Sequence, residues 1–159
     1  MTRSVSRPRL RSAARVALGA VLVFAGTSHL TSARDDFRAQ VPPWVPLDVD
    51  AVVLVSGVVE IGLGVLLTVL PRQQRRIGLL VALFFVAVLP GNIAQFTEHR
   101  DAFGLDTDAE RALRLLGQPV LVAWAWWSTR TAPRDRGGPH PVSTPPAVPV
   151  AGHRPVVRP

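Results

Sequence analysis

One stretch decides the fold: Ser56-Gly57-Val58-Val59-Glu60-Ile61-Gly62-Leu63-Gly64. It lies inside the apolar run 51–70, in which Glu60 is the only charged residue. About twenty mostly apolar residues are enough to cross the hydrocarbon core of a bilayer as a helix. An acid at the centre of such a helix costs roughly 2.5–3.5 kcal/mol, so it normally has a partner and faces the protein interior or water. Because Ser56, Glu60 and Gly64 recur every four residues, one helix face carries the acid between small residues.

The remaining chain predicts a membrane bundle around this face. Of the 159 residues, 48% are apolar. Four segments are apolar enough to span, at 13–31, 51–70, 77–96 and 112–128. They predict an all-α, four-helix transmembrane bundle over residues 13–130. Residues 1–12 are expected to form a disordered basic arm, and residues 131–159, which hold eight of the fifteen prolines, a disordered Pro/Arg-rich cytoplasmic tail.

The charged residues predict the orientation of this bundle. The formal net charge is +7, and every basic residue other than the histidines is an arginine. Most arginines lie before the first span, between the second and third, or after the fourth, while the other two loops hold most of the acids. The positive-inside rule then gives up-down connectivity with both termini cytoplasmic. The basic charge is therefore a topology signal, and no nucleic-acid partner is expected.

Two other classes are disfavoured. The chain has no cysteine, which excludes disulfides and Cys-ligated zinc or iron–sulfur sites. The basic start followed by residues 16–25 has the general form of a signal peptide. However, Phe24-Ala25-Gly26-Thr27 offers no clean small-residue cleavage motif, and cleavage would leave three spans. We therefore expect the first helix to be retained.

Polar side chains from all four spans fall in the outer half of the bilayer under this topology. Glu60 lies ten residues from the outer end of its span, about 15 Å at 1.5 Å per residue. The sequence therefore predicts a polar cluster in the bundle core near the outer surface. Its members are His29, Ser56, Glu60, Asn92, Gln95, Arg114 and Gln118.

Three uses of this cluster differ in chemistry. A pair of Glu60 with Arg114 or with His29 would offset the free-energy cost of a buried charge. A Glu–His pair could also relay protons. Alternatively, the polar groups only fasten the helices together, at about 0.6 kcal/mol for each interhelical bond. A metal site is disfavoured, because His29, His99 and one carboxylate are too sparse.

Five motifs, taken in order, resemble the DoxX-like membrane proteins. They are Gly26-x-x-His29, Val41-Pro42-Pro43 to Pro46, Ser56-Gly57-x-x-Glu60-Ile61, Pro90-Gly91-Asn92-Ile93 and Arg114-Leu115-x-x-Gln118-Pro119. Family members often have Pro-Ala-Asn at the fourth motif, so Gly91 is a departure. The resemblance implies a four-helix protein of the bacterial inner membrane. It also implies an association with membrane oxidoreductases, such as quinol oxidases and thiosulfate:quinone oxidoreduction, and with oxidative-stress resistance. It supplies no catalytic residues.

Two functional hypotheses follow. In the first, the protein is an accessory subunit of a membrane redox or oxidative-stress system, and the cluster binds a quinone headgroup or stabilises an oxidoreductase partner. In the second, it is a non-enzymatic membrane scaffold or interaction protein with a structural polar core. Both place it in the lipid bilayer, and a homo-oligomer is compatible with either. A channel or carrier is disfavoured, because four spans leave little room for alternating access.

Overall fold

The computed structural model describes residues 7–130; the first six residues and the expected tail, 131–159, lie outside it. The described part of the chain is all-helical and contains no strand, which confirms the all-α class predicted from the sequence. Its elements in chain order are α1 (Arg7–Leu30), α2 (Arg34–Arg38), α3 (Val49–Val69), the 3-10 turn η1 (Pro71–Gln73), α4 (Gln74–Thr97) and α5 (Asp108–Thr129).

One predicted boundary is wrong. The first helix begins at Arg7 rather than near residue 13, so residues 7–12 of the expected disordered arm are helical. Arginine, leucine and alanine are good helix formers, and the one proline, Pro8, falls in the first turn, where it removes no intrahelical hydrogen bond.

Within residues 7–130, three helical segments are long and apolar enough to cross a membrane: Arg9–Leu30, Val49–Val69 and Pro71–Thr97. Their length and composition indicate a membrane protein. The fourth long helix, α5, has a similar length of 22 residues but carries Arg111, Arg114 and Gln118 in its first half.

Local sequence explains where the helices begin and end. Asp48 caps α3 by accepting a hydrogen bond from the Ala51 amide at 2.8 Å. Thr107 and Glu110 form a capping box at the start of α5, with each side chain bonded to the other residue's backbone amide. At the far end of α3, the buried Arg15 side chain donates to the carbonyl oxygens of Leu67 and Thr68. A cation there satisfies free carbonyls and complements the helix dipole.

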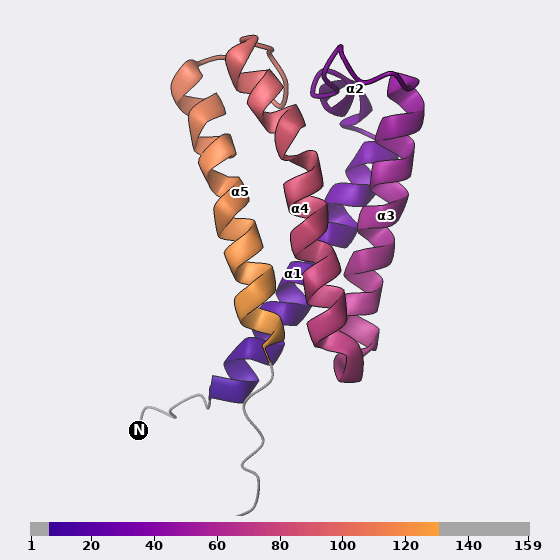
Figure 1. Ribbon diagram of the computed structural model, residues 1–159, viewed down its shortest axis with the longest axis vertical. Coiled ribbons are helices and arrows are strands. Elements are labelled where there is room, and N and C mark those ends of the chain that lie inside the picture. Colours follow the sequence, from indigo (N-terminus) through magenta and orange to yellow (C-terminus); the bar gives the residue numbers. More distant parts are fainter. Residues whose placement is uncertain (1–6, 131–159) are drawn as a thin grey trace, which may run out of the picture.

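The long helices form two antiparallel pairs, α1 with α3 and α4 with α5 (Figure 1). Two glycine contacts bring α1 and α3 together backbone to backbone. A Cβ on Gly19 would lie 2.8 Å from the Gly64 oxygen, and a Cβ on Gly26 would lie 2.6 Å from the Gly57 oxygen. Both contacts are reciprocal and repeat seven residues apart in each helix. Such small residues permit close helix packing where lipid provides no hydrophobic driving force.

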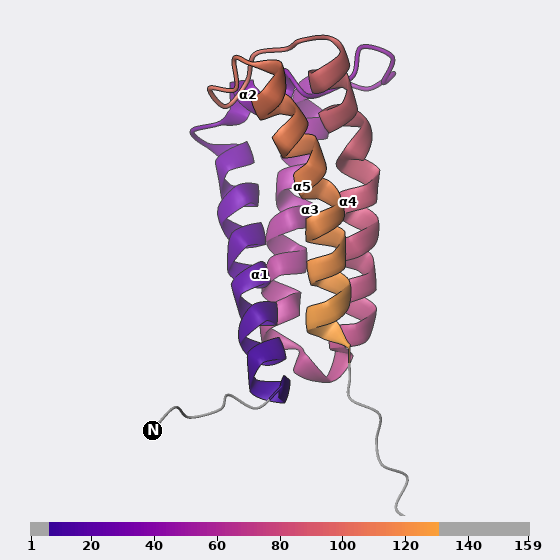
Figure 2. The ribbon, with the colours of Figure 1, turned by 90° about the vertical axis from the view of Figure 1, so that its left-hand side faces the viewer.

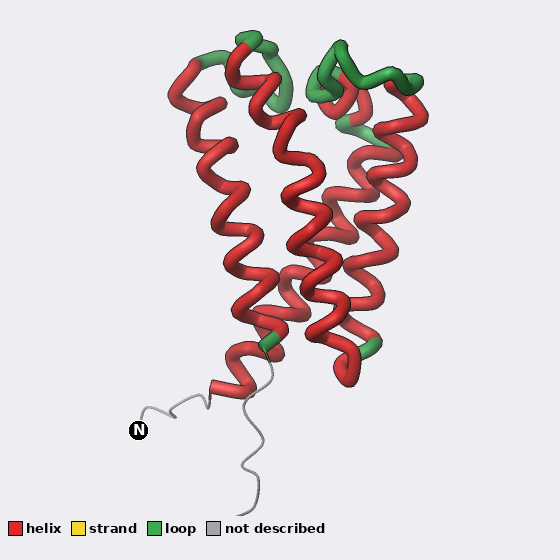
Figure 3. The backbone as a smooth tube through the Cα atoms, in the orientation of Figure 1, coloured by secondary structure: helices red, strands yellow, loops and turns green. Residues whose placement is uncertain are grey.

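The two pairs share a core at one end of the molecule. This terminal end is where α1 begins and α5 ends, and the other, the loop end, carries α2 and residues 98–107 (Figures 1 and 3). The Trp124 indole donates to the Ala14 carbonyl at 3.0 Å and ties α5 to α1 there. Toward the loop end the pairs diverge (Figure 1). The buried core consists of Leu18, Leu22, Leu63, Leu67, Ile77, Val81, Ala82, Phe85 and Ala125.

Candidate functional site

A cavity of about 890 Å³ occupies the space between the two diverging helix pairs. Side chains from all four long helices line it, together with α2 and the segment that follows α2. The walls are mostly apolar, with contributions from Leu22, Val53, Phe84, Phe85 and Leu121. A volume of this size, apolar walls and a few convergent polar groups are typical of small-molecule sites.

Glu60 and His29 meet at the wall formed by the first helix pair. The Nε2 atom of His29 lies 3.2 Å from Oε2 of Glu60, and both residues are more than nine-tenths buried. The other ring nitrogen, Nδ1, lies 3.0 Å from the Ser56 hydroxyl and 3.3 Å from the Val53 carbonyl. Both ring nitrogens of His29 therefore have polar neighbours on α3. The imidazole lies between the Glu60 carboxylate and the Ser56 hydroxyl, which is one turn earlier in the same helix.

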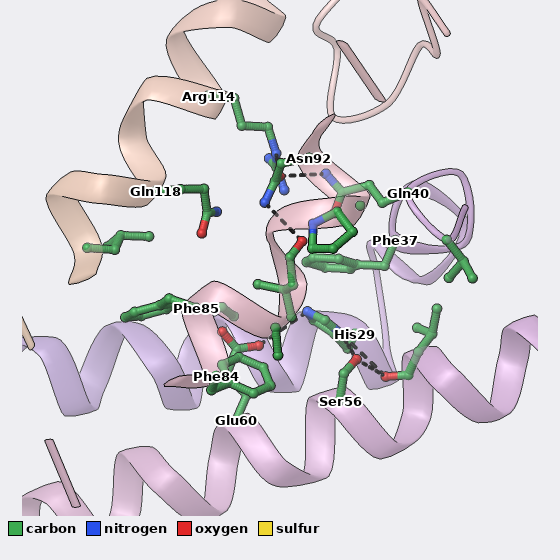
Figure 4. Close-up of a pocket in the computed structure, with 18 of the residues that line it drawn as sticks. His29, Phe37, Gln40, Ser56, Glu60, Phe84, Phe85, Asn92, Arg114 and Gln118 are labelled. Atoms are coloured by element: carbon green, nitrogen blue, oxygen red, sulfur yellow. Dashed lines mark hydrogen bonds and ion pairs between the residues drawn. The ribbon is translucent and has the colours of Figure 1, made fainter. Parts of the chain in front are cut away.

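Two buried oxygens in this cavity lack a hydrogen-bond partner among the described residues: Oε2 of Glu60 and Oε1 of Gln118. His29 is close to the Glu60 oxygen, but the two groups form no hydrogen bond, so the contact is one of proximity. Figure 4 shows the two side chains entering the cavity from different helices, Glu60 from α3 and Gln118 from α5. An unsatisfied buried acceptor costs about 1–3 kcal/mol, so both oxygens favour a donor supplied by a ligand.

Arg114 forms a third polar corner at the loop end. Its Nε donates to Oδ1 of Asn92 at 3.2 Å. The Gln40 amide lies 3.0 Å from both Nε and Nη2 of Arg114, so its oxygen faces the guanidinium and accepts from it. The amides of Gln40 and Gln95 are 2.7 Å apart. Gly91 permits this arrangement, because a Cβ there would lie 2.9 Å from the Gln40 backbone oxygen.

Aromatic rings cover the cavity at the loop end. Phe37 of α2 stacks on the His29 ring with centroids 3.4 Å apart, and Phe103 meets Phe37 edge-on at 4.7 Å. The Arg114 guanidinium lies 4.0 Å from the centre of the Phe103 ring, a cation–π contact. The series His29–Phe37–Phe103–Arg114 thus connects the first helix pair to the second across the cavity; we call these four residues the aromatic bridge.

Hydrogen bonds hold the two loops together at this end. Asp36 accepts from the Phe103 amide at 2.7 Å, and Arg100 donates to the carbonyls of Ala39 and Val41 at 2.9 and 3.1 Å. Phe103 has a φ of +59°, which is rare for an aromatic residue. These contacts hold its backbone in that conformation. The loops therefore position the aromatic bridge.

Charges outside the apolar segments organise the second loop. The His99 ring lies 2.8 Å from Asp108, and this hydrogen bond lowers the pKa of the Asp108 carboxyl, with a further contribution from Arg111. Hydrogen bonds from Thr107 lower the pKa of the Glu110 carboxyl. The Arg111 side chain is only 5% exposed and donates to Asp101, Asp108 and the carbonyls of Arg100 and Asp106.

The structure places six of the seven residues of the expected cluster on the cavity wall: His29, Ser56, Glu60, Asn92, Arg114 and Gln118. The seventh, Gln95, is buried behind the wall against Gln40. Of the two partners considered for Glu60, the structure brings His29 to it, while Arg114 contacts Asn92 and Gln40. His99 lies on the second loop and contacts Asp108.

Sequence reasoning missed Phe37, Gln40 and Phe103. All three lie in the polar connections between the long helices. A weak signal was present: Phe37 and Phe103 are single aromatic residues within charged segments, Arg34-Asp35-Asp36-Phe37-Arg38 and Arg100-Asp101-Ala102-Phe103. A large apolar ring in such a segment is best placed by a contact with the core.

Comparison with known proteins identifies one family. A family model described as a domain of unknown function (DUF8561) matches residues 18–129, so the chain belongs to that family. The match runs from the middle of α1 to the end of α5 and contains the whole cavity. Searches of curated proteins and of solved structures found no match.

Proposed function

We propose that this member of the DUF8561 family is a four-span membrane protein that binds a quinone-class molecule in the cavity between its helix pairs, as an accessory subunit of a membrane redox or oxidative-stress system. One observation carries the proposal. A largely apolar cavity of about 890 Å³ contains two buried oxygens, on Glu60 and Gln118, that accept no hydrogen bond from the described residues.

The fourth span in this proposal is α5. It packs antiparallel to α4 along its length, and its polar residues Arg114 and Gln118 face the cavity rather than the surface. Leu113, Leu116 and Val120 are 63–71% exposed and would face lipid. With four spans, the arginine-rich ends and the turn at Pro71–Gln73 fall on one side, which the positive-inside rule makes cytoplasmic.

The polar groups match the two redox forms of a quinone. A quinol hydroxyl is a donor, and the Glu60 carboxylate and the Gln118 oxygen are acceptors. A quinone carbonyl is an acceptor, for which Arg114 and the Gln118 amide nitrogen offer donors. The His29 imidazole lies 3.2 Å from Glu60. It provides a second basic group for a proton that a quinol releases. A flat apolar ring would meet Phe84 and Phe85 in the walls.

The resemblance to DoxX-like proteins supports the redox context and a bacterial inner-membrane location. The five motifs that carry it contribute six polar cavity residues: His29, Ser56, Glu60, Asn92, Arg114 and Gln118. A redox subunit without cysteine would depend on a bound cofactor or on partner subunits for electron transfer.

A structural polar core is the second candidate, and one set of contacts favours it. At the loop-end corner of the cavity, four polar side chains contact one another rather than leaving space for a ligand: Arg114, Asn92, Gln40 and Gln95. In a scaffold or interaction protein, such bonds would only fasten α5 and α4 to the first loop. This candidate does not account for the unpartnered oxygens at Glu60 and Gln118.

Quinone binding by the full-length protein in lipid nanodiscs tests the proposal. We expect wild type to bind a ubiquinone or menaquinone analogue, and Glu60→Gln and Gln118→Leu to weaken binding about tenfold each, the loss of one buried hydrogen bond. Glu98→Gln, an exposed acid in the second loop, is the matched control and should bind as wild type. If no quinone binds, or if both cavity variants lose stability but not affinity, the structural alternative holds.

A further inference from the structure

The cavity reaches the molecular surface between α1 and α5. Phe24 of α1 and Val120 of α5 line the cavity, yet they are 76% and 63% exposed. Gly117, one turn from Val120 on α5, also lines it, and a Cβ there would meet no atom within 4 Å. Figure 1 shows α1 and α5 near one another at the terminal end and farther apart toward the loop end, and Figure 2 shows α3 behind the two helices.

This opening lies in the apolar part of the helices. Val21 and Phe24 belong to the segment Arg9–Leu30, which is apolar enough to cross a membrane, and no charged residue follows Arg15 in it. The α5 side of the opening is formed by Gly117, Val120 and Leu121. In a bilayer these residues face acyl chains rather than water. An entrance for a water-soluble ligand would need polar walls, which this opening lacks.

We infer that the ligand enters from the bilayer through this opening and carries a long apolar tail that leaves the cavity between α1 and α5. The inference rests on the proposed binding function and specifies its ligand class: a lipid-soluble amphiphile with its polar head at Glu60 and Gln118. A polar head alone would leave most of the apolar wall without contacts. We call Val21, Phe24, Gly117 and Val120 the lateral opening.

Gly117 offers a direct test with a matched control. A Cβ at position 117 enters open space and meets no atom within 4 Å, so a leucine there would extend into the lateral opening. Gly62 of α3 is also helical, and a Cβ there also meets nothing within 4 Å, but Gly62 does not line the cavity. Gly62→Leu and Gly117→Leu therefore each add a leucine side chain and each remove a glycine that destabilises its helix. Only the second narrows the lateral opening.

The measurement is the affinity of nanodisc-embedded full-length protein for decylubiquinone and for duroquinone, a ring without a tail. Affinities are expressed per mole of quinone dissolved in the lipid, so that partitioning cancels. We expect wild type to prefer decylubiquinone about tenfold, Gly117→Leu to lose that preference while still binding duroquinone, and Gly62→Leu to bind both as wild type.

Two results would overturn the inference: equal affinity of wild type for the two quinones, or a Gly117→Leu protein that binds decylubiquinone as tightly as wild type. In either case duroquinone binding would leave the proposed function standing. Failure of wild type to bind either quinone would reject the proposed function and this inference together.

Discussion

Gly26 and Gly57 place the backbones of α1 and α3 in direct contact: a Cβ on Gly57 would lie 2.9 Å from the Gly26 oxygen and 2.7 Å from Cβ of His29. This contact also sets the site, because His29 and Glu60 lie one turn beyond the two glycines. A larger residue here would separate the helices and move His29 away from Glu60.

We therefore expect Gly57→Val to lower the free energy of unfolding by about 1–3 kcal/mol, the usual cost of overpacking. Denaturant titration in mild detergent would measure it. Gly62→Val, on the same helix in open space, should leave the free energy of unfolding near that of wild type. Equal effects of the two substitutions would show that the contact does not hold the helices.

Gln40 should hold the first loop against α4 and α5. Gln40→Ala removes the amide that contacts Arg114 and Gln95, and it leaves a half-buried guanidinium short of an acceptor. We expect a loss of about 1–3 kcal/mol in the free energy of local opening, seen as faster amide exchange over residues 34–47. Gln73→Ala, at an exposed position in the turn after α3, is the control. Unchanged exchange in Gln40→Ala would contradict the role of this amide.

Arg111 should not be replaceable by lysine. Its guanidinium, almost fully buried, contacts two carboxylates and two carbonyls at once, which a single ammonium cannot reproduce. Arg111→Lys is expected to expose residues 98–107 to protease at lower denaturant concentration than wild type. The exposed Arg75→Lys should cleave as wild type does. Identical cleavage of the two variants would mean that Arg111 does not organise the loop.

The start of α5 should fray in acid. The pKa of Glu110 is lowered from 4.5 by its hydrogen bonds with Thr107, so this carboxylate stabilises the folded state. The contribution is complete above pH 4.5 and is lost as pH falls through the lowered pKa. The amide-exchange rate at residues 109–111, expressed relative to the intrinsic rate at each pH, should therefore rise as the pH falls through this range. Glu110→Gln keeps a capping box without a titrating group, so its acid-dependent rise should be smaller, with the remainder due to Asp108.

Membrane orientation can be tested with single cysteines, since the native chain has none. A cysteine at Gln73, in the turn between α3 and α4, should react with an impermeant maleimide only after the cells are permeabilised. A cysteine at Leu47, which is 65% exposed at the loop end, should react in intact cells. The reverse pattern would overturn the proposed topology.

The sequence was sufficient for the four long helices and for most of the polar residues on the cavity wall. A membrane helix must bury or pair any charged residue, so Glu60, Arg114 and the polar residues near them had to face the interior. Their depth followed from the span boundaries, and depth alone predicted that they would gather at one end.

Contacts made by loops could not be predicted in the same way. Phe37, Gln40 and Phe103 depend on α2, on a backbone φ of +59° and on bonds between residues more than 50 positions apart. No periodicity encodes such geometry. The sequence also left open whether Glu60 would meet His29 or Arg114, because both lie at similar depth and only the packing of the two helix pairs separates them.

The division of the cavity between two helix pairs has a consequence for biogenesis. Glu60 and His29 belong to one helical hairpin and Gln118 and Arg114 to the other, and only the short turn Pro71–Gln73 joins the two hairpins. In the proposed four-span topology, each hairpin can insert into the membrane before the two dock. A ligand that contacts both stabilises the docked arrangement by mass action. Occupancy of the cavity would thus act as a checkpoint, marking chains whose assembly is complete.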